Sequence, residues 1–256
     1  MSLLGREFTP YNPFGPYIVK SSISDETFDI LLDTANKIRK NKFLKNKNDY
    51  RKSLAGNLSE EYSYANAFTK KQEKIIEEEL CWLASVYTKT AKKIIFKDLS
   101  LEPKDIVLQK PIWVNFMKSG EWNPLHSHTA DISCVIYLQV PDEISEENLK
   151  NESSSNSNTP SAGKIDFQYG DDITYSSTGF MVQPKEKDIF LFPARLRHMV
   201  YPFKSNVERI SVSCNFANKI KALKDLNSSG ERWYKLNVIN RDRRKYYGKK
   251  RYTNRI

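Results

Sequence analysis

From Ile106 onwards the sequence consists of short segments rich in β-branched and aromatic residues, and this pattern limits the fold more than any other feature. Proline and glycine separate the segments, which are long enough for strands and too short for regular helices. Many short strands with frequent turns are typical of a β-sandwich or a barrel. The predicted strands are residues 106–109, 113–117, 132–140, 165–169, 188–192, 199–203 and 209–216.

The first third of the chain has a helical pattern instead. Ser24 can cap a helix whose first turn carries the acidic residues Asp25 and Glu26, and apolar residues recur at helical spacing up to residue 38. A second helix is predicted from about residue 70 to 94, with a polar loop at residues 56–62 between the two. We expect both helices to pack as a support layer against one face of a sheet.

The sequence therefore predicts a mainly β chain with N-terminal helices, of the α+β type. Residues 1–105 form the helical support region, residues 106–218 the strand-rich core, and residues 219–256 a basic C-terminal extension. Residues 143–163 are rich in serine and asparagine, and we predict that they form a flexible insertion in the core.

The formal net charge of +10 comes from the C-terminal extension, where residues 219–256 hold 13 lysines and arginines against 3 acidic residues. Basic residues alternate with tyrosines in residues 241–256, which indicates a weak contact with nucleic acid through phosphates and stacked bases.

Cys81, Cys134 and Cys214 are far apart and odd in number, so we expect reduced core cysteines. No secretory signal or membrane span is visible, and a cytoplasmic location is the expectation.

The chain has three histidines, His126, His128 and His198. Residues two apart in a strand point to the same side, so His126 and His128 can bind one ion together. A third ligand from a distant strand completes one face of an octahedron and leaves the opposite positions open. Arg209 follows His198 by eleven residues, and with Ser211 on the same strand face it can bind a carboxylate.

These segments, in this order, resemble the iron(II)- and 2-oxoglutarate-dependent oxygenases, most closely their prolyl-hydroxylase-like, phage-associated branch. The matching segments are residues 113–117, 123–141, 188–203 and 209–213. The resemblance implies a double-stranded β-helix (a cupin-like jelly roll) over residues 106–218, with Fe(II), 2-oxoglutarate and O2 as cofactor and co-substrates. It also implies the host cytoplasm as the location if a phage encodes the chain.

The resemblance further implies a role for individual residues. His126 and His198 would be the iron-binding histidines. Arg209 would bind the distal carboxylate of 2-oxoglutarate, assisted by Ser211 and Tyr137.

One departure from the family pattern leaves the second metal ligand open. The family usually has an aspartate or glutamate two residues after the first histidine, and His128 stands there in this chain. His128 can itself be the second ligand, or Asp131 can reach in from the following turn. In a third alternative, as in the halogenase branch, His128 replaces His126 and Ala130 takes the carboxylate position.

The expected reaction is hydroxylation of a peptide or protein residue, with proline as one candidate, and with release of succinate and CO2. A small molecule or an alkylated nucleic acid is the alternative substrate. Two other classes of protein share parts of the pattern: a catalytically inert β-helix binding module, and a cupin-type metalloenzyme that does not use 2-oxoglutarate. The sequence does not predict the oligomeric state.

Overall fold

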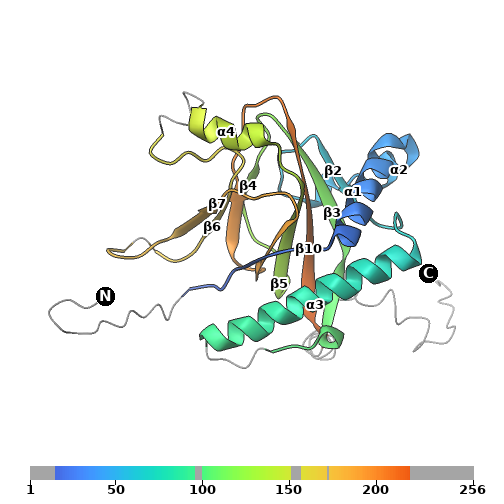
Figure 1. Cartoon of the computed structure of the whole chain (residues 1–256), viewed down its shortest axis with the longest axis horizontal. Helices are drawn as coiled ribbons and strands as arrows, with labels where there is room; N and C mark the ends of the chain where they lie inside the picture. Colours follow the sequence, from blue (N-terminus) through green and yellow to red (C-terminus); the bar gives the residue numbers. More distant parts are fainter. Residues whose placement is uncertain (1–14, 96–99, 151–156, 172, 220–256) are drawn as a thin grey trace, which may run out of the picture.

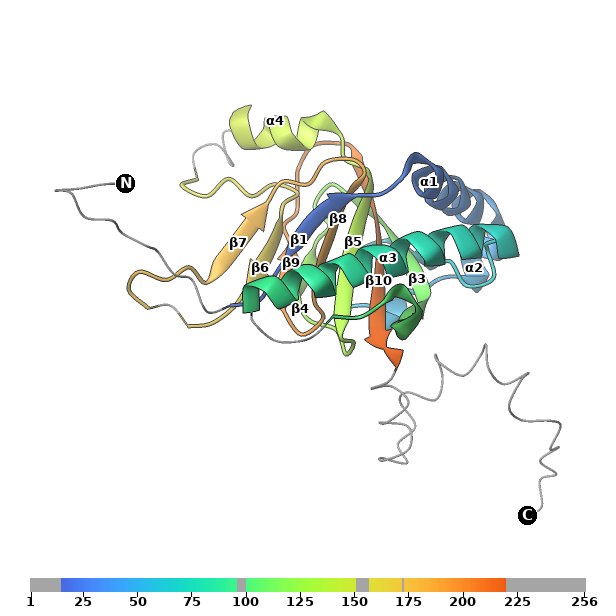
Figure 2. The same cartoon turned by 60° about the horizontal axis from the view of Figure 1, so that its bottom comes forward.

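Two antiparallel β-sheets pack face to face, and helices cover the outer face of the larger sheet (Figures 1 and 2). The computed structural model describes residues 15–95, 100–150, 157–171 and 173–219. The larger sheet has the strand order β1-β8-β5-β10-β3-β2, and the smaller one β4-β9-β6-β7. The strands are β1 (Val19–Ser22), β2 (Glu60–Ser63), β3 (Ile106–Lys118), β4 (Asn123–His126), β5 (Ile132–Gln139), β6 (Ile165–Gln168), β7 (Gly179–Val182), β8 (Asp188–Pro193), β9 (Arg197–Val200) and β10 (Glu208–Asn218).

From β3 to β10 the chain passes back and forth between the two sheets. Strands β3, β5, β8 and β10 lie in the larger sheet, and β4, β6, β7 and β9 lie in the smaller one. This winding is the double-stranded β-helix that the sequence predicted. The two sheets stay separate and do not close into a barrel.

Helices α1 (Asp25–Lys40) and α3 (Lys70–Ile95) form the predicted support layer on the larger sheet (Figure 2). Helix α1 begins after the predicted cap, and the Ser24 hydroxyl accepts a hydrogen bond from the Thr27 backbone N–H at 3.2 Å. A short helix α2 (Lys42–Lys47) follows α1. The helices and the outer face of the sheet bury one hydrophobic core, which includes Leu31, Ala35, Ile38, Ile76, Leu80, Val114, Phe116, Ile136, Val212 and Phe216.

A second hydrophobic core lies between the sheets, because successive side chains of a strand point to opposite faces. Strand β5 sends Cys134 and Ile136 to the helices, and Val135 and Tyr137 to the second core. All three cysteines are buried thiols outside any disulfide, as predicted. Strand β10 differs from β5 on its inner face, where the side chains are polar: Arg209, Ser211 and Ser213 line a cavity between the sheets.

The structure corrects the prediction of two strands at residues 106–109 and 113–117, because β3 is continuous from Ile106 to Lys118. Proline has no N–H to donate to a strand ladder, so Pro111 indicated a break. The strand tolerates Pro111 by an irregularity instead, since its pairing with β10 shifts register between Ser213 and Asn215.

Residues 143–163 are not wholly the flexible insertion that we predicted, because helix α4 (Asp142–Lys150) occupies the start of this range. Ile144 is fully buried in the core between the sheets. The Glu147 carboxylate accepts hydrogen bonds from the backbone N–H groups of Lys204 and Ser205, at 2.8–3.0 Å. These contacts come from distant residues, and the local composition does not reveal them. Residues 151–156 lie outside the described part of the chain.

The predicted polar loop at residues 56–62 is also partly wrong, because Glu60–Ser63 form the edge strand β2. Two adjacent glutamates do not favour a strand, but pairing with β3 stabilises one here. Short strands of four residues at β1, β4 and β7 likewise escaped the prediction.

Arg39 ties helix α1 to two strands of the larger sheet. Its guanidinium donates two hydrogen bonds to Glu208 on β10, at 2.6 and 2.7 Å, and two to Glu60 on β2, at 3.0 and 3.3 Å. It also lies over the Phe116 ring, 4.5 Å from the ring centroid. Burial raises the pKa of Glu60, but hydrogen bonds from Lys118, Tyr62 and Arg39 outweigh burial and bring that pKa down to about 2.

We predict that Arg39→Met lowers the free energy of unfolding by about 2–3 kcal/mol, because the partly buried Glu208 loses its charged donor and Glu60 loses one of several donors. Urea denaturation at pH 7 measures the loss. Lys74→Met is the matched control, since Lys74 forms an exposed 3.7 Å ion pair with Glu78 and its loss should not shift the midpoint. Equal midpoints for wild type and Arg39→Met would contradict this account.

Candidate metal centre

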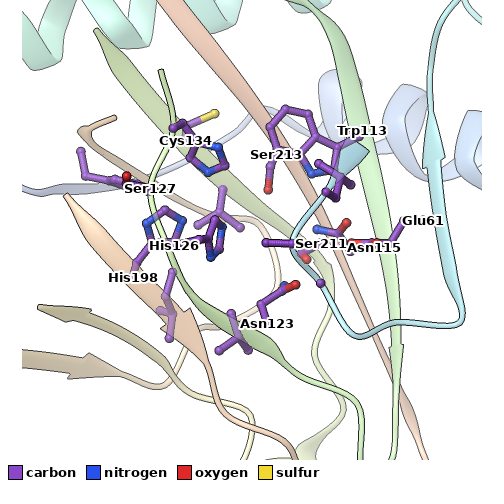
Figure 3. A pocket seen from close by; sticks show the side chains of 18 of the residues that line it. Glu61, Trp113, Asn115, Asn123, His126, Ser127, Cys134, His198, Ser211 and Ser213 are labelled. Carbon is purple, nitrogen blue, oxygen red and sulfur yellow. The ribbon is translucent and has the colours of Figure 1, made fainter. Parts of the chain in front are cut away.

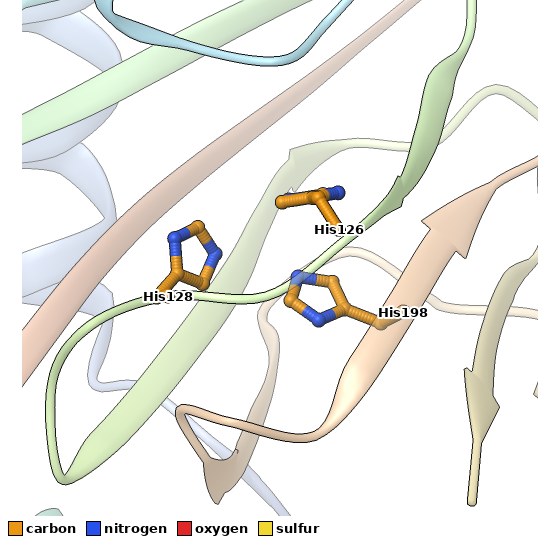
Figure 4. Close-up of side chains that lie close together, drawn as sticks. All are labelled: His126, His128 and His198. Carbon is orange, nitrogen blue, oxygen red and sulfur yellow. The ribbon is translucent and has the colours of Figure 1, made fainter.

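The structure brings the three histidines together at one end of the space between the sheets (Figure 4). His126 ends β4 and pairs in register with His198 on β9, and His128 follows two residues later. The ring centroids of His126 and His198 are 4.3 Å apart, and His128 lies 5.1 and 5.2 Å from them. One ligand atom from each ring lies within 4.8 Å of the other two, a spacing that can hold a metal ion.

Backbone carbonyls orient two of the three rings. The Nδ1 atom of His126 lies 2.7 Å from the Pro124 carbonyl oxygen, and that of His198 lies 3.0 Å from the Leu196 carbonyl oxygen. A carbonyl oxygen can only accept, so Nδ1 carries the proton in both rings. The Nε2 lone pair is then free for a metal, the usual arrangement of metal-binding histidines.

All three imidazoles are neutral at pH 7. Burial lowers the pKa of His128 to about 4 and that of His198 to about 3, and the neighbouring His126 adds to both shifts. Burial also lowers the pKa of His126. Since a metal binds only the neutral imidazole, the site is in its binding form before any ion arrives.

Asp131, the alternative second ligand, does not belong to this group of histidines. Its Oδ2 accepts a hydrogen bond from the Asn218 backbone N–H at 2.9 Å, and its own N–H donates to the Phe216 carbonyl oxygen at 3.1 Å. His128, by contrast, is held in place by a 2.8 Å hydrogen bond from its backbone N–H to the Ala194 carbonyl oxygen. The geometry therefore favours His128 over Asp131, with His126 in the same group.

The histidines open into a cavity of about 200 Å³ between the sheets (Figure 3). Strand β10 forms one wall with Arg209, Ser211 and Ser213, because alternate residues of a strand share a face. Strands β3 and β2, the next two strands of the same sheet, continue this wall with Trp113, Asn115 and Glu61. The loop before β2 borders the cavity with Ser53, Leu54, Ala55 and Gly56. The smaller sheet, which carries His126 and His198, lies on the opposite side.

Arg209 is a buried cation without a counter-ion. It is 1% exposed, and its Nη1 donates to the Gly163 carbonyl oxygen at 2.9 Å, but its Nε has no hydrogen-bond partner. No carboxylate of the described residues lies within ion-pair distance of it. Burial lowers the pKa of Arg209, yet an arginine stays charged in a protein. Such a group is costly unless an anion binds it.

Two of the other predicted residues lie next to Arg209. Tyr137 on β5 is paired in register with Ser211 on β10, and its ring lies 5.5 Å from the Arg209 guanidinium. The Tyr137 hydroxyl is buried without a hydrogen-bond partner, and burial raises its pKa to about 12. The phenol therefore keeps its proton and can donate. A carboxylate placed here would satisfy Arg209 and Tyr137 together, so the donor set fits a 2-oxo dicarboxylic acid chelated at the histidines.

Two further polar residues line the cavity, Glu61 and Asn115, and neither was predicted from the sequence as a site residue. They are paired in register across β2 and β3, and each has a buried oxygen without a hydrogen-bond partner. Burial, together with the negative charge of Glu121, raises the pKa of Glu61 to about 7. Asn115 could have been found, because it alternates with Trp113 and Met117 on the inner face of a predicted strand. Glu61 lay in the segment that we predicted to be a loop.

The fold and the site together define a class of protein, the non-haem metalloenzymes built on a double-stranded β-helix. Residues 111–215 match the family described as 2OG-Fe(II) oxygenase. The match covers 105 of the 256 residues, and the Fe(II), 2-oxoglutarate and O2 that the chemistry of this family uses fit the histidine group and the buried Arg209. The chain is an enzyme and not an inert module.

Several solved structures are similar to the chain at low sequence identity. A prolyl-4-hydroxylase from Pseudomonas putida shares 13% identity with a TM-score of 0.43, over 78% of this chain and 92% of that one. A viral collagen prolyl hydroxylase from Paramecium bursaria Chlorella virus-1 shares 17% identity with a TM-score of 0.44, over 79% and 96%. A prolyl hydroxylase from Trichoplax adhaerens, in complex with a peptide fragment of hypoxia inducible factor, shares 11% identity with a TM-score of 0.46, over 84% and 87%.

No curated protein sequence matches the chain. Within the described residues, no helix combines the length and the apolar character that crossing a bilayer requires. The cytoplasmic location and the phage-associated branch stay predictions.

The raised pKa of Glu61 makes a prediction about stability. A folded-state pKa of about 7, above the unfolded value of 4.5, means that the folded protein holds this proton more tightly. The resulting stabilisation is complete below pH 4.5 and is lost as the pH rises to 7. Between pH 5 and pH 8, Glu61→Gln should therefore gain on the order of 2 kcal/mol in unfolding free energy relative to wild type.

Urea denaturation of both proteins at the two pH values measures this difference. Groups common to both proteins, such as the histidines, cancel in the comparison. A constant difference between the two curves would show that the Glu61 carboxyl is well solvated or paired.

Proposed function

We propose that the chain is an Fe(II)- and 2-oxoglutarate-dependent hydroxylase acting on a peptide or protein residue, with proline as one candidate. His126, His128 and His198 hold the iron, and Arg209, Ser211 and Tyr137 hold the distal carboxylate of 2-oxoglutarate. The observation that carries the proposal is that three neutral imidazoles and one unpaired, buried arginine line the same small cavity.

The residues of the chain bind and orient. The Pro124 and Leu196 carbonyls hold the rings of His126 and His198 through Nδ1, so that both Nε2 atoms would be free to bind the ion. Arg209 and Tyr137 are rigid because they are fully buried, so the co-substrate has a defined orientation. Bound Fe(II) supplies the oxidative chemistry with 2-oxoglutarate and O2, which yields succinate, CO2 and the hydroxylated substrate.

The place of His128 has an electrostatic consequence. A neutral imidazole leaves the metal centre one unit more positive than the carboxylate that usually stands two residues after the first histidine. The site should then attract the dianionic 2-oxoglutarate more strongly.

The edge of the smaller sheet supports a peptide as the substrate. Strand β7 is the last strand of that sheet, so one of its backbone edges has no strand partner among the described residues, and an extended chain can pair there. Phe180 on β7 is 53% exposed, and its ring lies 6.4 Å from that of Phe167. The Phe167 ring lies in turn 6.1 Å from that of His198, so neighbouring aromatic rings connect this edge with the histidines.

The basic residues 241–256 made a nucleic acid an alternative substrate in the sequence analysis, and these residues lie outside the described part of the chain. No described feature favours that substrate over a peptide.

We predict that alanine at His126, His128 or His198 weakens Mn(II) binding by at least about 100-fold, because even the loss of a group that only supports a ligand costs 10- to 100-fold. Isothermal titration calorimetry with Mn(II) measures the affinity. Asp131→Asn should bind Mn(II) as wild type does, and His128→Asp should retain binding because it restores a ligand. If Asp131→Asn lost Mn(II) binding while His128→Ala bound normally, Asp131 and not His128 would be the metal ligand.

The function is tested by succinate formation that depends on both Fe(II) and 2-oxoglutarate. Arg209→Met should raise the KM for 2-oxoglutarate roughly 10- to 100-fold, since a charge-assisted pair is lost. The exposed Arg195 offers a matched control, Arg195→Met, which should leave the KM unchanged.

A metalloenzyme that does not use 2-oxoglutarate would form no succinate. The substrate class is tested on mixed proline-containing peptides, in which mass spectrometry should find the gain of one oxygen atom. Oxygen insertion into nucleobases or free small molecules, with none into peptides, would overturn the peptide assignment.

A further inference from the structure

Glu61 is a buried carboxyl group that neither the metal nor 2-oxoglutarate uses. It lies on β2, outside the family match at residues 111–215, and it lines the cavity while being only 1% exposed (Figure 3). Its Oε2 is buried without a hydrogen-bond partner, and no described side chain forms an ion pair with it. An unpaired buried carboxyl costs stability, so its position in the cavity calls for a functional reason.

The Oε2 atom of Glu61 receives no hydrogen bond from the described residues, and a second acceptor beside it is in the same state. The Oδ1 atom of Asn115, its register partner on β3, is also buried without a partner. The negative charges of Glu121 and Asp49 raise the pKa of Glu61, and the positive charge of Arg51 lowers it. Two neighbouring oxygens that both lack a donor can be satisfied together by one group with several N–H bonds.

Gly56 allows the loop before β2 to pack closely against Glu61, because it has no side chain. A Cβ atom added at Gly56 would come within 2.6 Å of Glu61 Oε1 and would also collide with Asn123 Oδ1. The loop thus approaches Glu61 as closely as a residue without a side chain allows. The carboxyl group is held in the cavity wall and is not free to swing into solvent.

Glu61 is the acidic side chain of the cavity that neither the metal nor the co-substrate needs. Besides the three histidines, Arg209 and Glu61 are the charged side chains among the described residues that line it. The histidines are needed for the metal, and Arg209 for the co-substrate carboxylate. Only Glu61 is then left to select a substrate by charge.

We propose that Glu61, assisted by Asn115, binds a cationic N–H group of the substrate, an amine or a guanidinium such as a lysine or arginine side chain carries. This inference deepens the proposed function, on which it rests, by naming a basic residue at or beside the oxidised position. A charged donor inside a cavity forms stronger hydrogen bonds than a neutral one, so the cation distinguishes the substrate from neutral residues of similar shape.

The inference is tested with two pairs of probes that differ in charge and hardly in shape. N-acetyl-lysine methylamide is compared with its norleucine analogue, and N-acetyl-arginine methylamide with its citrulline analogue. Ligand-observed NMR measures binding to the protein with Mn(II) and 2-oxoglutarate and to the metal-free protein. Wild type should bind at least one cationic probe about tenfold more tightly than its neutral analogue.

Glu61→Gln keeps the size of the side chain and should remove this preference. Glu60→Gln is the matched control, because Glu60 lies on the opposite face of β2, bonded to Arg39 and Lys118, and should keep the preference. Equal binding of both members of each pair by wild type, or a preference that survives in Glu61→Gln, would overturn the inference. Failure of wild type to bind any probe would do so as well.

The same NMR samples separate this inference from the proposed function. Bound Mn(II) broadens the signals of a probe that lies near the histidines. A protein that binds Mn(II) and forms succinate but shows no charge preference would refute the role of Glu61 alone. A protein that takes up no Mn(II) and forms no succinate would refute the proposed function, while the charge preference of the metal-free protein still reports on Glu61.

Discussion

The structure depends on the burial of polar side chains without partners between two β-sheets. The inner faces of a β-sandwich are usually apolar, and here β5 and β8 follow that rule with Val135, Tyr137, Phe190 and Phe192. Strand β10 breaks it with Arg209 and two serines in the middle of the larger sheet. The fold tolerates this cost because its stability comes from elsewhere. Bound ligands then recover part of the cost, since anything that binds only the folded state stabilises it.

That other stability comes largely from the outer face of the same sheet. The side chains of β10 that alternate with Arg209 and Ser211 are Ile210, Val212 and Cys214, and they are buried against the helices. Glu208, next to Arg209, bonds to Arg39 of helix α1. The strand that carries the proposed co-substrate residues is therefore held by packing and by an ion pair on its outer face, so its inner face can carry polar side chains for binding.

Much of the metal centre could be predicted because its signals lie close together in the sequence. His126 and His128 are two residues apart, and His198 and Arg209 follow strands whose apolar runs are easy to see. The choice between His128 and Asp131 could not be made from the sequence, because both lie within one turn of chain. It depends on where each backbone is anchored, and Asp131 is bonded to the end of β10.

Elements that rely on distant partners were harder to predict. The acidic strand β2 exists because it pairs with β3, so Glu61 was not recognised as a cavity residue. Helix α4 is stabilised by the burial of Ile144 and by contacts of Glu147 with residues near 204, and its own sequence is polar. Pro111 suggested a break that β3 avoids by a register shift against β10. In each case tertiary contacts override the local preference.

The most direct test of the account is a crystal structure of the protein with Mn(II) and 2-oxoglutarate, grown without oxygen. The account predicts Nε2 of His126 and His198 and a ring nitrogen of His128 as the protein ligands, with the distal carboxylate bonded to Arg209 and Tyr137. A metal bound by Asp131 in place of His128, or a co-substrate carboxylate that leaves Arg209 unpaired, would contradict it.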